Sequence, residues 1–461
     1  MPAPTDATPA VALTRDQRRT LALSALGGAL EFYDFVIFVF FATTMGTLFF
    51  PADMPDWLRL VQTFGIFAAG YLARPLGGVV MAHFGDLAGR KRMFMLSILL
   101  MAVPTLLMGL LPTYAQVGVL APVLLLLLRI AQGAAIGGEA PGAWVFVTEH
   151  VSPRHRSLAC GTLSAGLLAG ILVGALVATA IHAALDDAQL LAWGWRVPFL
   201  VGGVFGLGAL HVRRRLRETP VFAELRERRA LSAGMPLRIV LREHPRAVVL
   251  SMLLTWLLTA SVVVSILMMP ALLQQAGIPR AAALAANSVA IACAMLANVL
   301  AGMLADRYGE GRVLAAWSLL MGMSFWAFYT LVPAHPQWLY PLYALVGASV
   351  GLTAMVPSIA VNAFPAPIRF SGLSFSYNVA YAICGGATPV AITLLLRNDP
   401  LAPAKYLAAM AVLGVALGLW VERAARSTSG SSAAPAGPRP AAAGQAAGAG
   451  PASSPPAAAP R

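Results

Sequence analysis

The chain has 461 residues, of which 59% are hydrophobic and only 11% are charged. Soluble proteins carry about 25% charged residues, so this composition argues against a single water-soluble enzyme and against a disordered chain. The formal net charge of +13 lies in short basic runs between long apolar stretches. Such a distribution is typical of loops at an anionic membrane leaflet rather than of a nucleic-acid-binding domain.

Long apolar stretches follow one another along the chain in two sets. The first set predicts spans at residues 21–50, 58–84, 93–111, 117–148, 157–184 and 194–212, and the second at 247–273, 281–305, 312–332, 337–363, 370–396 and 402–421. We therefore predict an all-α integral membrane protein with twelve transmembrane helices in two six-helix bundles. The predicted domains are an amino-terminal segment (1–20), a first bundle (21–212), a basic linker (213–246), a second bundle (247–424) and a disordered Ala/Pro/Gly/Ser tail (425–461).

The basic residues predict the orientation of these spans. If the amino terminus lies inside, most Lys and Arg residues outside the apolar stretches fall in the segments on the inner side. The linker 213–246 alone holds ten arginines. Cytoplasmic loops of membrane proteins carry this excess. We therefore expect both termini and the linker to be cytoplasmic.

A charged turn occurs at matching positions in the two halves, as "HFGDLAGRKR" after the second span and as "GMLADRYGEGR" after the eighth. In each copy a glycine follows an aspartate, Asp86 or Asp306, by three residues, which suits a tight turn. The aspartate can accept hydrogen bonds from the first amides of a neighbouring helix or pair with an arginine, whereas an ordinary charged turn is the alternative. The turn resembles the signature of the major facilitator superfamily, G-x-x-x-D-[RK]-x-G-[RK]-[RK]. The departures from that signature are Ala82, Leu87, Glu310 and Gly311.

The resemblance implies that these turns latch the two bundles and gate the cytoplasmic side. A weaker repeat, "EHVSPRHRSLACG" after span 4 and "NAFPAPIRFSG" after span 10, is expected to add cytoplasmic salt bridges to that gate. The residues expected in the gate are Asp86, Arg90, Lys91, Glu149, Arg154, Arg156, Asp306, Arg307 and Arg369.

Further motifs carry a more specific resemblance. They are "EFYDF" (31–35), "ARPLGG", "RIAQG", "GGE", "WGWRVPF" and "LRETPVF". Together they resemble the metabolite–proton symporter branch of the superfamily, whose members carry citrate, 2-oxoglutarate, other dicarboxylates, shikimate, or proline and betaine. The similarity covers most of the chain apart from the tail, and it does not identify the substrate.

Ionisable residues occur inside the predicted spans of the first half, where acids cost several kcal/mol unless they face a cavity or a partner. At 1.5 Å per residue, Asp34 and Arg129 fall at similar depths nearer the outside, with Glu31, Glu139 and Arg74 nearer the inside. The carboxylates outnumber the arginines by one, and arginines do not lose their protons. Desolvation favours the protonated form of the excess carboxylate. A bound anion that competes for an arginine would promote this protonation.

These considerations assign a role to each residue. We expect Asp34 or Glu31 to carry the proton and the solute anion to bind Arg129, with Arg74 second. Glu139 either braces helices or takes part in coupling. The neutral residues expected to contact the solute are Gln132, Tyr33, Asn362, Tyr377, Asn378 and Tyr381. The alternatives are that the charged residues only form ion pairs between helices and that the neutral ones only join helices by hydrogen bonds.

The sequence as a whole predicts a secondary active transporter of the bacterial plasma membrane that takes up a small organic anion with protons by alternating access. A di- or tricarboxylate such as citrate is the leading candidate, because two embedded arginines suit a multivalent anion. The alternatives are a zwitterionic osmolyte such as proline or betaine, a shikimate-like acid, and, from another class, a sensor or channel that does not transport. We expect no enzymatic activity, no cofactor, no metal and no nucleic-acid partner, with the monomer as the functional unit.

Overall fold

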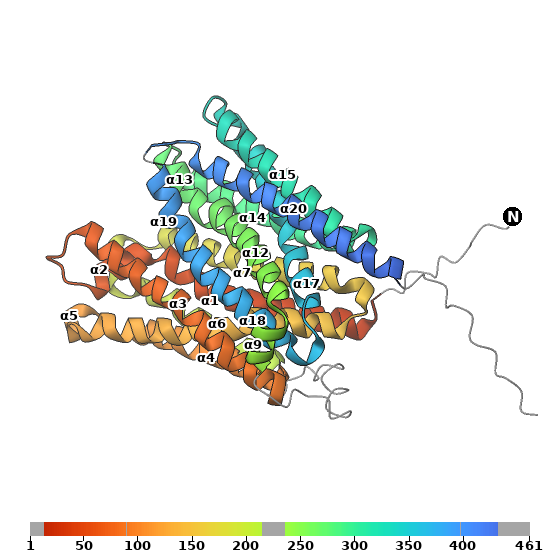
Figure 1. Cartoon of the computed structure of the whole chain (residues 1–461). Helices are drawn as coiled ribbons and strands as arrows, with labels where there is room; N and C mark the ends of the chain where they lie inside the picture. Colours follow the sequence, from red (N-terminus) through yellow and green to blue (C-terminus); the bar gives the residue numbers. More distant parts are fainter. Residues whose placement is uncertain (1–12, 89, 214–235, 397, 432–461) are drawn as a thin grey trace, which may run out of the picture. The chain divides into compact units, whose positions relative to one another are not determined.

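The computed structural model describes residues 13–88, 90–213, 236–396 and 398–431, and every regular element in these residues is helical (Figure 1). The amino-terminal half contains α1 (Arg15–Phe40), α2 (Ala42–Phe49), α3 (Asp56–Ala88), α4 (Arg90–Leu110), α5 (Tyr114–Val117), α6 (Leu120–His150), α7 (Arg156–Ala184), α8 (Asp187–Gln189) and α9 (Arg196–Arg213). The carboxy-terminal half contains α11 (Pro236–Glu243), α12 (Pro245–Val262), α13 (Met269–Gln275), α14 (Arg280–Tyr308), α15 (Glu310–Leu331), α16 (Leu339–Ser349), α17 (Met355–Asn362), α18 (Arg369–Ala380), α19 (Gly386–Leu395) and α20 (Ala402–Ser431).

The helices coincide with the predicted apolar stretches, which confirms the all-α expectation. Within the described residues, nine helical segments are long and apolar enough to cross a membrane, or ten if the bent pair Asp187–Gly194 and Arg196–Gly208 is one span. Met95–Leu110 of α4 is a shorter apolar helix. The count of twelve spans and the cytoplasmic position of the termini stay predictions. Most of the linker 213–246 and of the tail 425–461 lies outside the described residues, and α20 continues to Ser431.

Three spans of the carboxy-terminal half are interrupted by non-α turns. The π-helical turn η3 (Val263–Met268) joins α12 to α13, and the π-helical turn η7 (Tyr381–Gly385) joins α18 to α19. The 3₁₀ segment η5 (Val350–Ala354) joins α16 to α17. Such turns occur often at functional sites because they redirect the side chains that follow. Tyr381, one of the expected substrate residues, begins η7.

Glycines bring α3 and α6 into backbone contact. A Cβ atom at Gly133 would lie 1.9 Å from the carbonyl oxygen of Gly70, and one at Gly137 would lie 2.1 Å from the carbonyl oxygen of Arg74. Small residues allow the two backbones to approach this closely. In a membrane, such van der Waals packing holds helices together, because lipid provides no hydrophobic driving force between them. The contact fixes the heights of Arg74 and Arg129, since Arg74 follows Gly70 by one turn and Arg129 precedes Gly133 by one turn.

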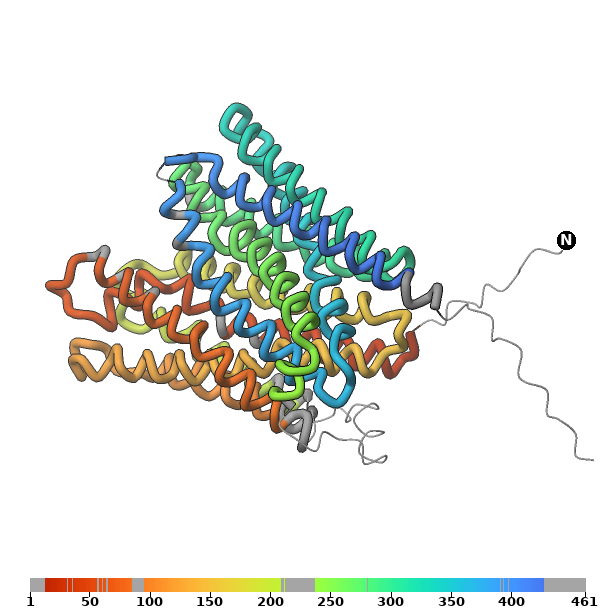
Figure 2. The backbone as a smooth tube through the Cα atoms, in the orientation of Figure 1, coloured from red at the N-terminus to blue at the C-terminus, as the bar shows by residue number. Residues whose placement is uncertain are grey.

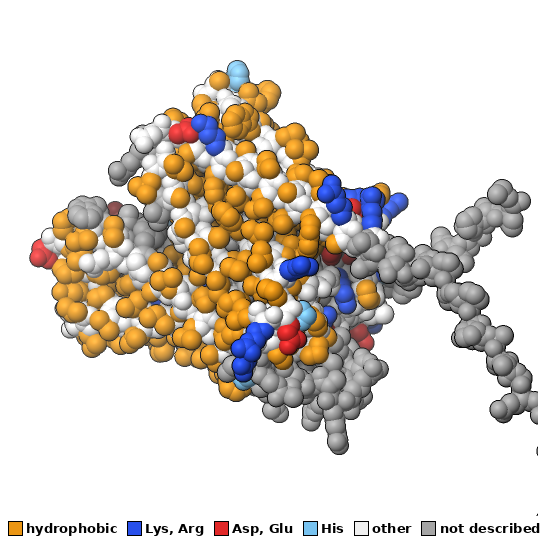
Figure 3. All heavy atoms as spheres, viewed as in Figure 1, with side chains coloured by type: hydrophobic (Ala, Val, Ile, Leu, Met, Phe, Trp, Pro, Cys, Tyr) orange, Lys and Arg blue, Asp and Glu red, His pale blue; other side chains and the backbone are white. Residues whose placement is uncertain are grey.

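The two halves meet along the helix pairs α7 with α14 and α3 with α18, which Figure 2 allows the reader to follow by colour. Glycines again permit close approach, since a Cβ atom at Gly161 of α7 would lie 2.4 Å from the carbonyl oxygen of Asn298 of α14. Residues 1–422 form one compact unit and residues 423–461 form a second. The helices carry hydrophobic side chains over most of the face seen in Figure 3, as expected where lipid is the solvent. Exposed examples are Leu72, Leu296 and Val412.

Candidate functional site

Arg74 of α3 lies between the two halves, inside a group of tyrosines. Its guanidinium carbon lies 4.1, 5.5 and 5.6 Å from the ring centroids of Tyr381, Tyr377 and Tyr71. Its Nε donates to Oδ1 of Asn378 on α18 at 3.4 Å. The side chain is only 1% exposed, and its Nη2 has no hydrogen-bond partner in the described residues. We call these five residues the Arg74 cluster.

Asn378 also fastens α18 to the amino-terminal half. Its Nδ2 donates to the carbonyl oxygen of Gly137 at 2.6 Å, and the Ser374 hydroxyl donates to the carbonyl oxygen of Gly78 at 2.9 Å. A side chain at Gly78 would prevent this contact, because its Cβ atom would lie 2.4 Å from Nδ2 of Asn378. The Arg74 cluster therefore depends on the halves being closed against each other at α3, α6 and α18.

Arg129 of α6 lies among different residues, and Phe38, Phe67 and Gln132 around it belong to the amino-terminal half. Its side chain is 0% exposed, and its guanidinium carbon lies 4.4 Å from the ring centroid of Phe38 and 5.1 Å from that of Phe67. Its Nη1 donates to Oε1 of Gln132 at 2.7 Å. Nε2 of Gln132 in turn donates to the Thr105 hydroxyl of α4 at 2.6 Å.

The Thr105 hydroxyl itself donates to the carbonyl oxygen of Met101 at 2.9 Å, and Asp34 of α1 is a polar neighbour of this hydroxyl. Asp34 is buried against α9, where a Cβ atom at Gly202 would lie 2.3 Å from its Oδ1. Two polar side chains therefore join Asp34 to Arg129, namely Thr105 and Gln132, and we call these four residues the Asp34–Arg129 chain. The sequence placed Asp34 and Arg129 at one depth but did not reveal the residues that connect them.

The remaining candidates of the first half divide differently from expectation. The hydroxyl of Tyr33 donates a hydrogen bond to the carbonyl oxygen of Pro198 at 3.0 Å. This hydroxyl was expected to contact the solute, and here it is bonded to the backbone instead. Glu139 is buried and accepts a hydrogen bond from Ser97 of α4. The side chain of Glu31 lies outside the described part of the chain.

Ion pairs and capping contacts join the halves at the face predicted to be cytoplasmic. Nη1 of Arg369 at the start of α18 lies 3.0 Å from Oε1 of Glu149 at the end of α6. Nη1 of Arg156 donates to Oδ1 of Asn362 at 2.7 Å. Asn362 therefore lies with the expected gate residues rather than in the Arg74 cluster, because it ends α17 at the exposed face.

Asp306, at the end of α14, caps the first turn of α7. Its two carboxylate oxygens accept from the backbone amides of Ser157 and Leu158, each at 2.9 Å. An anion at a helix amino terminus is favoured by the free amides and by the helix dipole. Glu310, a departure from the family signature, accepts from the Ser157 hydroxyl at 2.9 Å and from the Ser358 hydroxyl, so it adds a second contact between the halves.

Other expected gate residues do not join this group. Arg154 and Arg307 are exposed, and Arg307 lies over the ring of Tyr308 at 5.3 Å. The side chains of Asp86, Arg90 and Lys91 fall outside the described residues.

A small cavity of about 40 Å³ lies between the halves next to the Arg74 cluster. It is lined from both halves, with Phe32, Trp144, Ser164, Thr353, Tyr377 and Tyr381 among its walls. A volume of this size holds about one water molecule. The structure therefore holds the centre of the molecule nearly closed, and admission of a solute requires the halves to separate.

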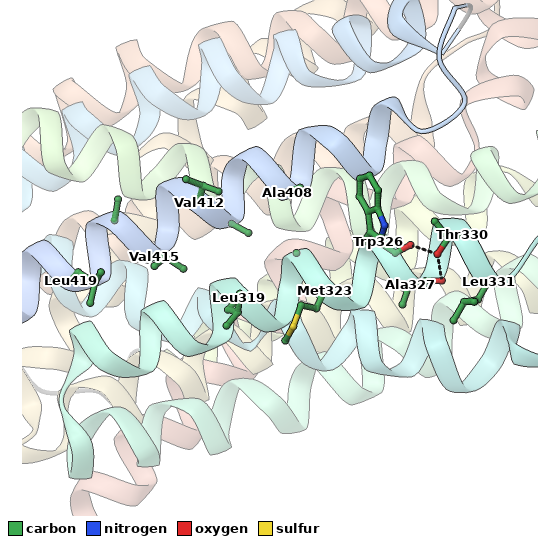
Figure 4. Close-up of a pocket in the computed structure, with 13 residues that line it drawn as sticks. Leu319, Met323, Trp326, Ala327, Thr330, Leu331, Ala408, Val412, Val415 and Leu419 are labelled. Carbon is green, nitrogen blue, oxygen red and sulfur yellow. Dashed lines mark hydrogen bonds between the residues drawn. The ribbon is translucent and has the colours of Figure 1, made fainter.

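A larger hollow, of about 940 Å³, lies between α15 and α20 (Figure 4). Its walls are apolar apart from the indole N–H of Trp326 and the hydroxyl of Thr330, which already donates to the carbonyl oxygens of Trp326 and Ala327. Exposed side chains such as Met323 and Val412 line it. The residues that line the groove include no charged side chain, and all of them come from α15 and α20 of one half, so we do not consider it a transport site.

Thr105, Tyr71 and Trp144 contact the candidate site residues and were not among the residues expected from the sequence. Tyr71 precedes Arg74 by three residues, so helical spacing alone could have placed it on the same face. Thr105 and Trp144 had no such signal, because their contacts come from helices that are distant in sequence.

Comparison with known proteins identifies the family. The family model of the Major Facilitator Superfamily matches residues 24–389. The inner membrane metabolite transport protein YhjE of Escherichia coli strain K12 is 34% identical over 86% of this chain and 92% of its own length. A putative proline/betaine transporter of Staphylococcus aureus strain COL is 32% identical over 90% of each chain. The chain belongs to the major facilitator superfamily.

A solved structure shows the same fold. The proton:xylose symporter XylE bound to 6-bromo-6-deoxy-D-glucose superposes with a TM-score of 0.73 over 88% of this chain and 95% of its own, at 16% identity. The family match and the two relatives, rather than this shared fold, identify the protein as a multi-pass secondary transporter of the bacterial plasma membrane and not an enzyme, as the sequence predicted.

Proposed function

We propose that this chain is a proton-coupled symporter that takes up a small solute with a single carboxylate. A zwitterion of the proline or betaine type is the leading candidate, and a shikimate-like acid is the second. The relative named as a proline/betaine transporter favours this substrate class over the di- or tricarboxylate that the sequence had placed first.

The number of arginines at the interface carries the choice of a single carboxylate. The preference for citrate assumed that Arg74 and Arg129 both face the solute. Arg129 is instead surrounded by Phe38, Phe67 and Gln132 of the amino-terminal half, whereas Arg74 touches residues of both halves. One guanidinium suits one carboxylate, because each guanidinium forms at most one bidentate pair.

The aromatic surroundings support a positively charged second group on the solute. Trp144 and Tyr381 both line the central cavity, and Tyr381 already lies against a cation, Arg74. Rings of this kind attract quaternary ammonium groups through their electron-rich faces. A betaine would place its carboxylate at Arg74 and its methylated nitrogen against these rings.

Proton coupling is assigned to Asp34. It is a buried acid for which the structure gives no direct lysine or arginine contact, and the Asp34–Arg129 chain leads from it to Arg129. Arg129 lies over Phe67, the Phe67 ring lies 5.0 Å from that of Tyr71, and Tyr71 contacts Arg74. Rearrangement at Arg74 on solute binding would be transmitted along this face of α3 to Asp34.

Alternating access would open the contacts at the predicted cytoplasmic face. The Glu149–Arg369 pair, the Arg156–Asn362 hydrogen bond and the capping of α7 by Asp306 all join the two halves there. These contacts hold that face closed, and their release would expose the central cavity to the cytoplasm.

Proteoliposomes containing the purified full-length chain would test this function. With an inward proton gradient imposed, we expect accumulation of radiolabelled glycine betaine or proline, and little accumulation of citrate. Citrate accumulation with the highest kcat/KM of the panel would restore the multivalent anion. Failure of betaine, proline, shikimate and citrate alike to accumulate would favour a sensor that no longer transports.

A further inference from the structure

Trp144 of α6 is a second buried donor beside the Arg74 cluster. Its side chain is 2% exposed, and its Nε1 has no hydrogen-bond partner in the described residues. A buried donor without a hydrogen-bond partner destabilises the protein, because it has lost its hydrogen bonds to water. Trp144 nevertheless lines the central cavity, where a bound solute would supply an acceptor.

Burial without a partner is not in itself a sign of binding. Trp195 is 0% exposed and its Nε1 also has no hydrogen-bond partner in the described chain. It packs against Phe49 and Phe199 in an apolar cluster, away from the central cavity. What distinguishes Trp144 is therefore its place on the cavity wall.

Tyr377 connects Trp144 to Arg74. The Trp144 and Tyr377 rings meet edge to face with centroids 5.1 Å apart and planes at 82°, and the guanidinium carbon of Arg74 lies 5.5 Å from the same tyrosine ring. Arg74 and Trp144 thus each present an unpartnered buried nitrogen donor next to one tyrosine. Trp144 comes from α6, Arg74 from α3 and Tyr377 from α18, so the three meet only when the halves are together.

We propose that Trp144 is a substrate-binding residue whose Nε1–H donates a hydrogen bond to an oxygen acceptor of the solute, beside the carboxylate held by Arg74. The acceptor is the second carboxylate oxygen in a betaine, and it is either that oxygen or a ring hydroxyl in a shikimate-like acid. This inference rests on the proposed transport function, and it explains why an indole rather than a phenyl ring lies at this wall of the cavity.

The variant Trp144→Phe tests the donor, because it removes the N–H and keeps an aromatic ring against Tyr377. In proteoliposomes with an imposed proton gradient, we expect KM for glycine betaine to rise about tenfold, the effect of one lost hydrogen bond to a charged acceptor. Trp195→Phe, the matched control, is expected to leave KM unchanged. Thermal unfolding midpoints of the three proteins establish that the variants fold.

A second variant, Trp144→His, keeps a ring N–H and is expected to have a lower KM than Trp144→Phe. Should Trp144→Phe fail to fold, Trp144→Met takes its place in this comparison. A rise in KM for both betaine and shikimate supports the carboxylate as acceptor, whereas a rise for shikimate alone contradicts the hydrogen bond proposed for betaine. If wild type transports betaine and Trp144→Phe or Trp144→Met keeps the wild-type KM for both solutes, the inference is wrong. If wild type itself transports neither, the proposed function has failed instead.

Discussion

The two buried arginines of the amino-terminal half look equivalent in the sequence and differ in the structure. Arg129 is enclosed by residues of its own half and leads through Gln132 and Thr105 to Asp34. Arg74 lies among tyrosines from both halves and keeps one nitrogen without a partner in the described residues. Two arginines that are equally buried can therefore have different roles, depending on which helices surround them. An arginine enclosed by one half can adjust a neighbouring acid, whereas an arginine shared by both halves can report that a solute has arrived.

The largest effect is expected from Asp34→Asn, which removes the acid of the Asp34–Arg129 chain and leaves the Arg74 cluster intact. Proton-driven accumulation of betaine should be abolished, because an amide carries no exchangeable charge. Exchange of external labelled betaine for internal unlabelled betaine should persist, since it needs binding but no net proton movement. Normal accumulation by this variant would remove Asp34 from the proton pathway.

Arg74→Lys should have the next largest effect. A lysine keeps the charge but loses the flat guanidinium that stacks on Tyr381 and donates to Asn378. We expect kcat/KM for betaine to fall about 100-fold, equivalent to about 2.7 kcal/mol. Exchange, which Asp34→Asn should keep, should slow in Arg74→Lys by a similar factor at low betaine concentration, because solute binding is weakened. Retention of exchange would show that the solute carboxylate is bound elsewhere.

Glu149→Gln tests the contacts between the halves, because it removes the carboxylate that pairs with Arg369. Breaking a largely buried pair favours the state in which the pair is already apart. Cys160 reports that state, because it is 0% exposed on α7 close to the interface. In a background with Cys293→Ser and Cys384→Ser, we expect about tenfold faster labelling of Cys160 by a maleimide. Lys405→Gln, which breaks an exposed pair with Asp399, is the control and should leave the rate unchanged.

The smallest effect is expected from Thr105→Val, which interrupts the Asp34–Arg129 chain without changing a charge. Gln132 would lose the hydroxyl that accepts from its Nε2, so we expect the pH of half-maximal betaine uptake to change by about one unit or less. KM for betaine at saturating proton concentration should stay within about twofold. A large change in KM with no change in the pH profile would place Thr105 with the solute instead.

Asp399 provides the pH control for that experiment. The hydrogen bond from Lys405, and then that from the Leu401 amide, hold the pKa of Asp399 below its usual value. A carboxyl with a lowered pKa is ionised throughout the range above about pH 4, and its contribution to stability is lost only as the pH falls through that lowered value. Asp399→Asn should therefore leave the pH profile of uptake between pH 5 and pH 8 unchanged.

Much of the fold could be predicted from the sequence, because hydrophobic length determines where helices cross a membrane. The α14 to α15 turn was likewise predictable, and Asp306 makes one of the two contacts that its chemistry allowed. The depth of a residue along a helix was also accessible, since the rise per residue is constant. Depth placed Asp34 and Arg129 together, and it gave no information on which neighbouring helix supplies Thr105.

The substrate class illustrates the same limit. The number of buried arginines favoured a multivalent anion such as citrate, whereas the position of Arg74 and the relative named as a proline/betaine transporter favour the zwitterion proposed above. Asn362 was also placed with the solute, although it ends α17 at the exposed face and binds Arg156. The direction in which a side chain points, and the residue that it contacts, depend on how helices distant in sequence pack together. Close glycine contacts such as that of Gly133 with Gly70 determine this packing.

Proton movement during solute entry is the most direct test of whether betaine and protons are transported together. In lightly buffered proteoliposomes with no imposed gradient, addition of glycine betaine to the wild-type protein should make the external medium more alkaline in proportion to the betaine that enters. Arg74→Lys should show neither betaine entry nor a pH change. Entry of betaine into wild-type vesicles without any external pH change would contradict the account.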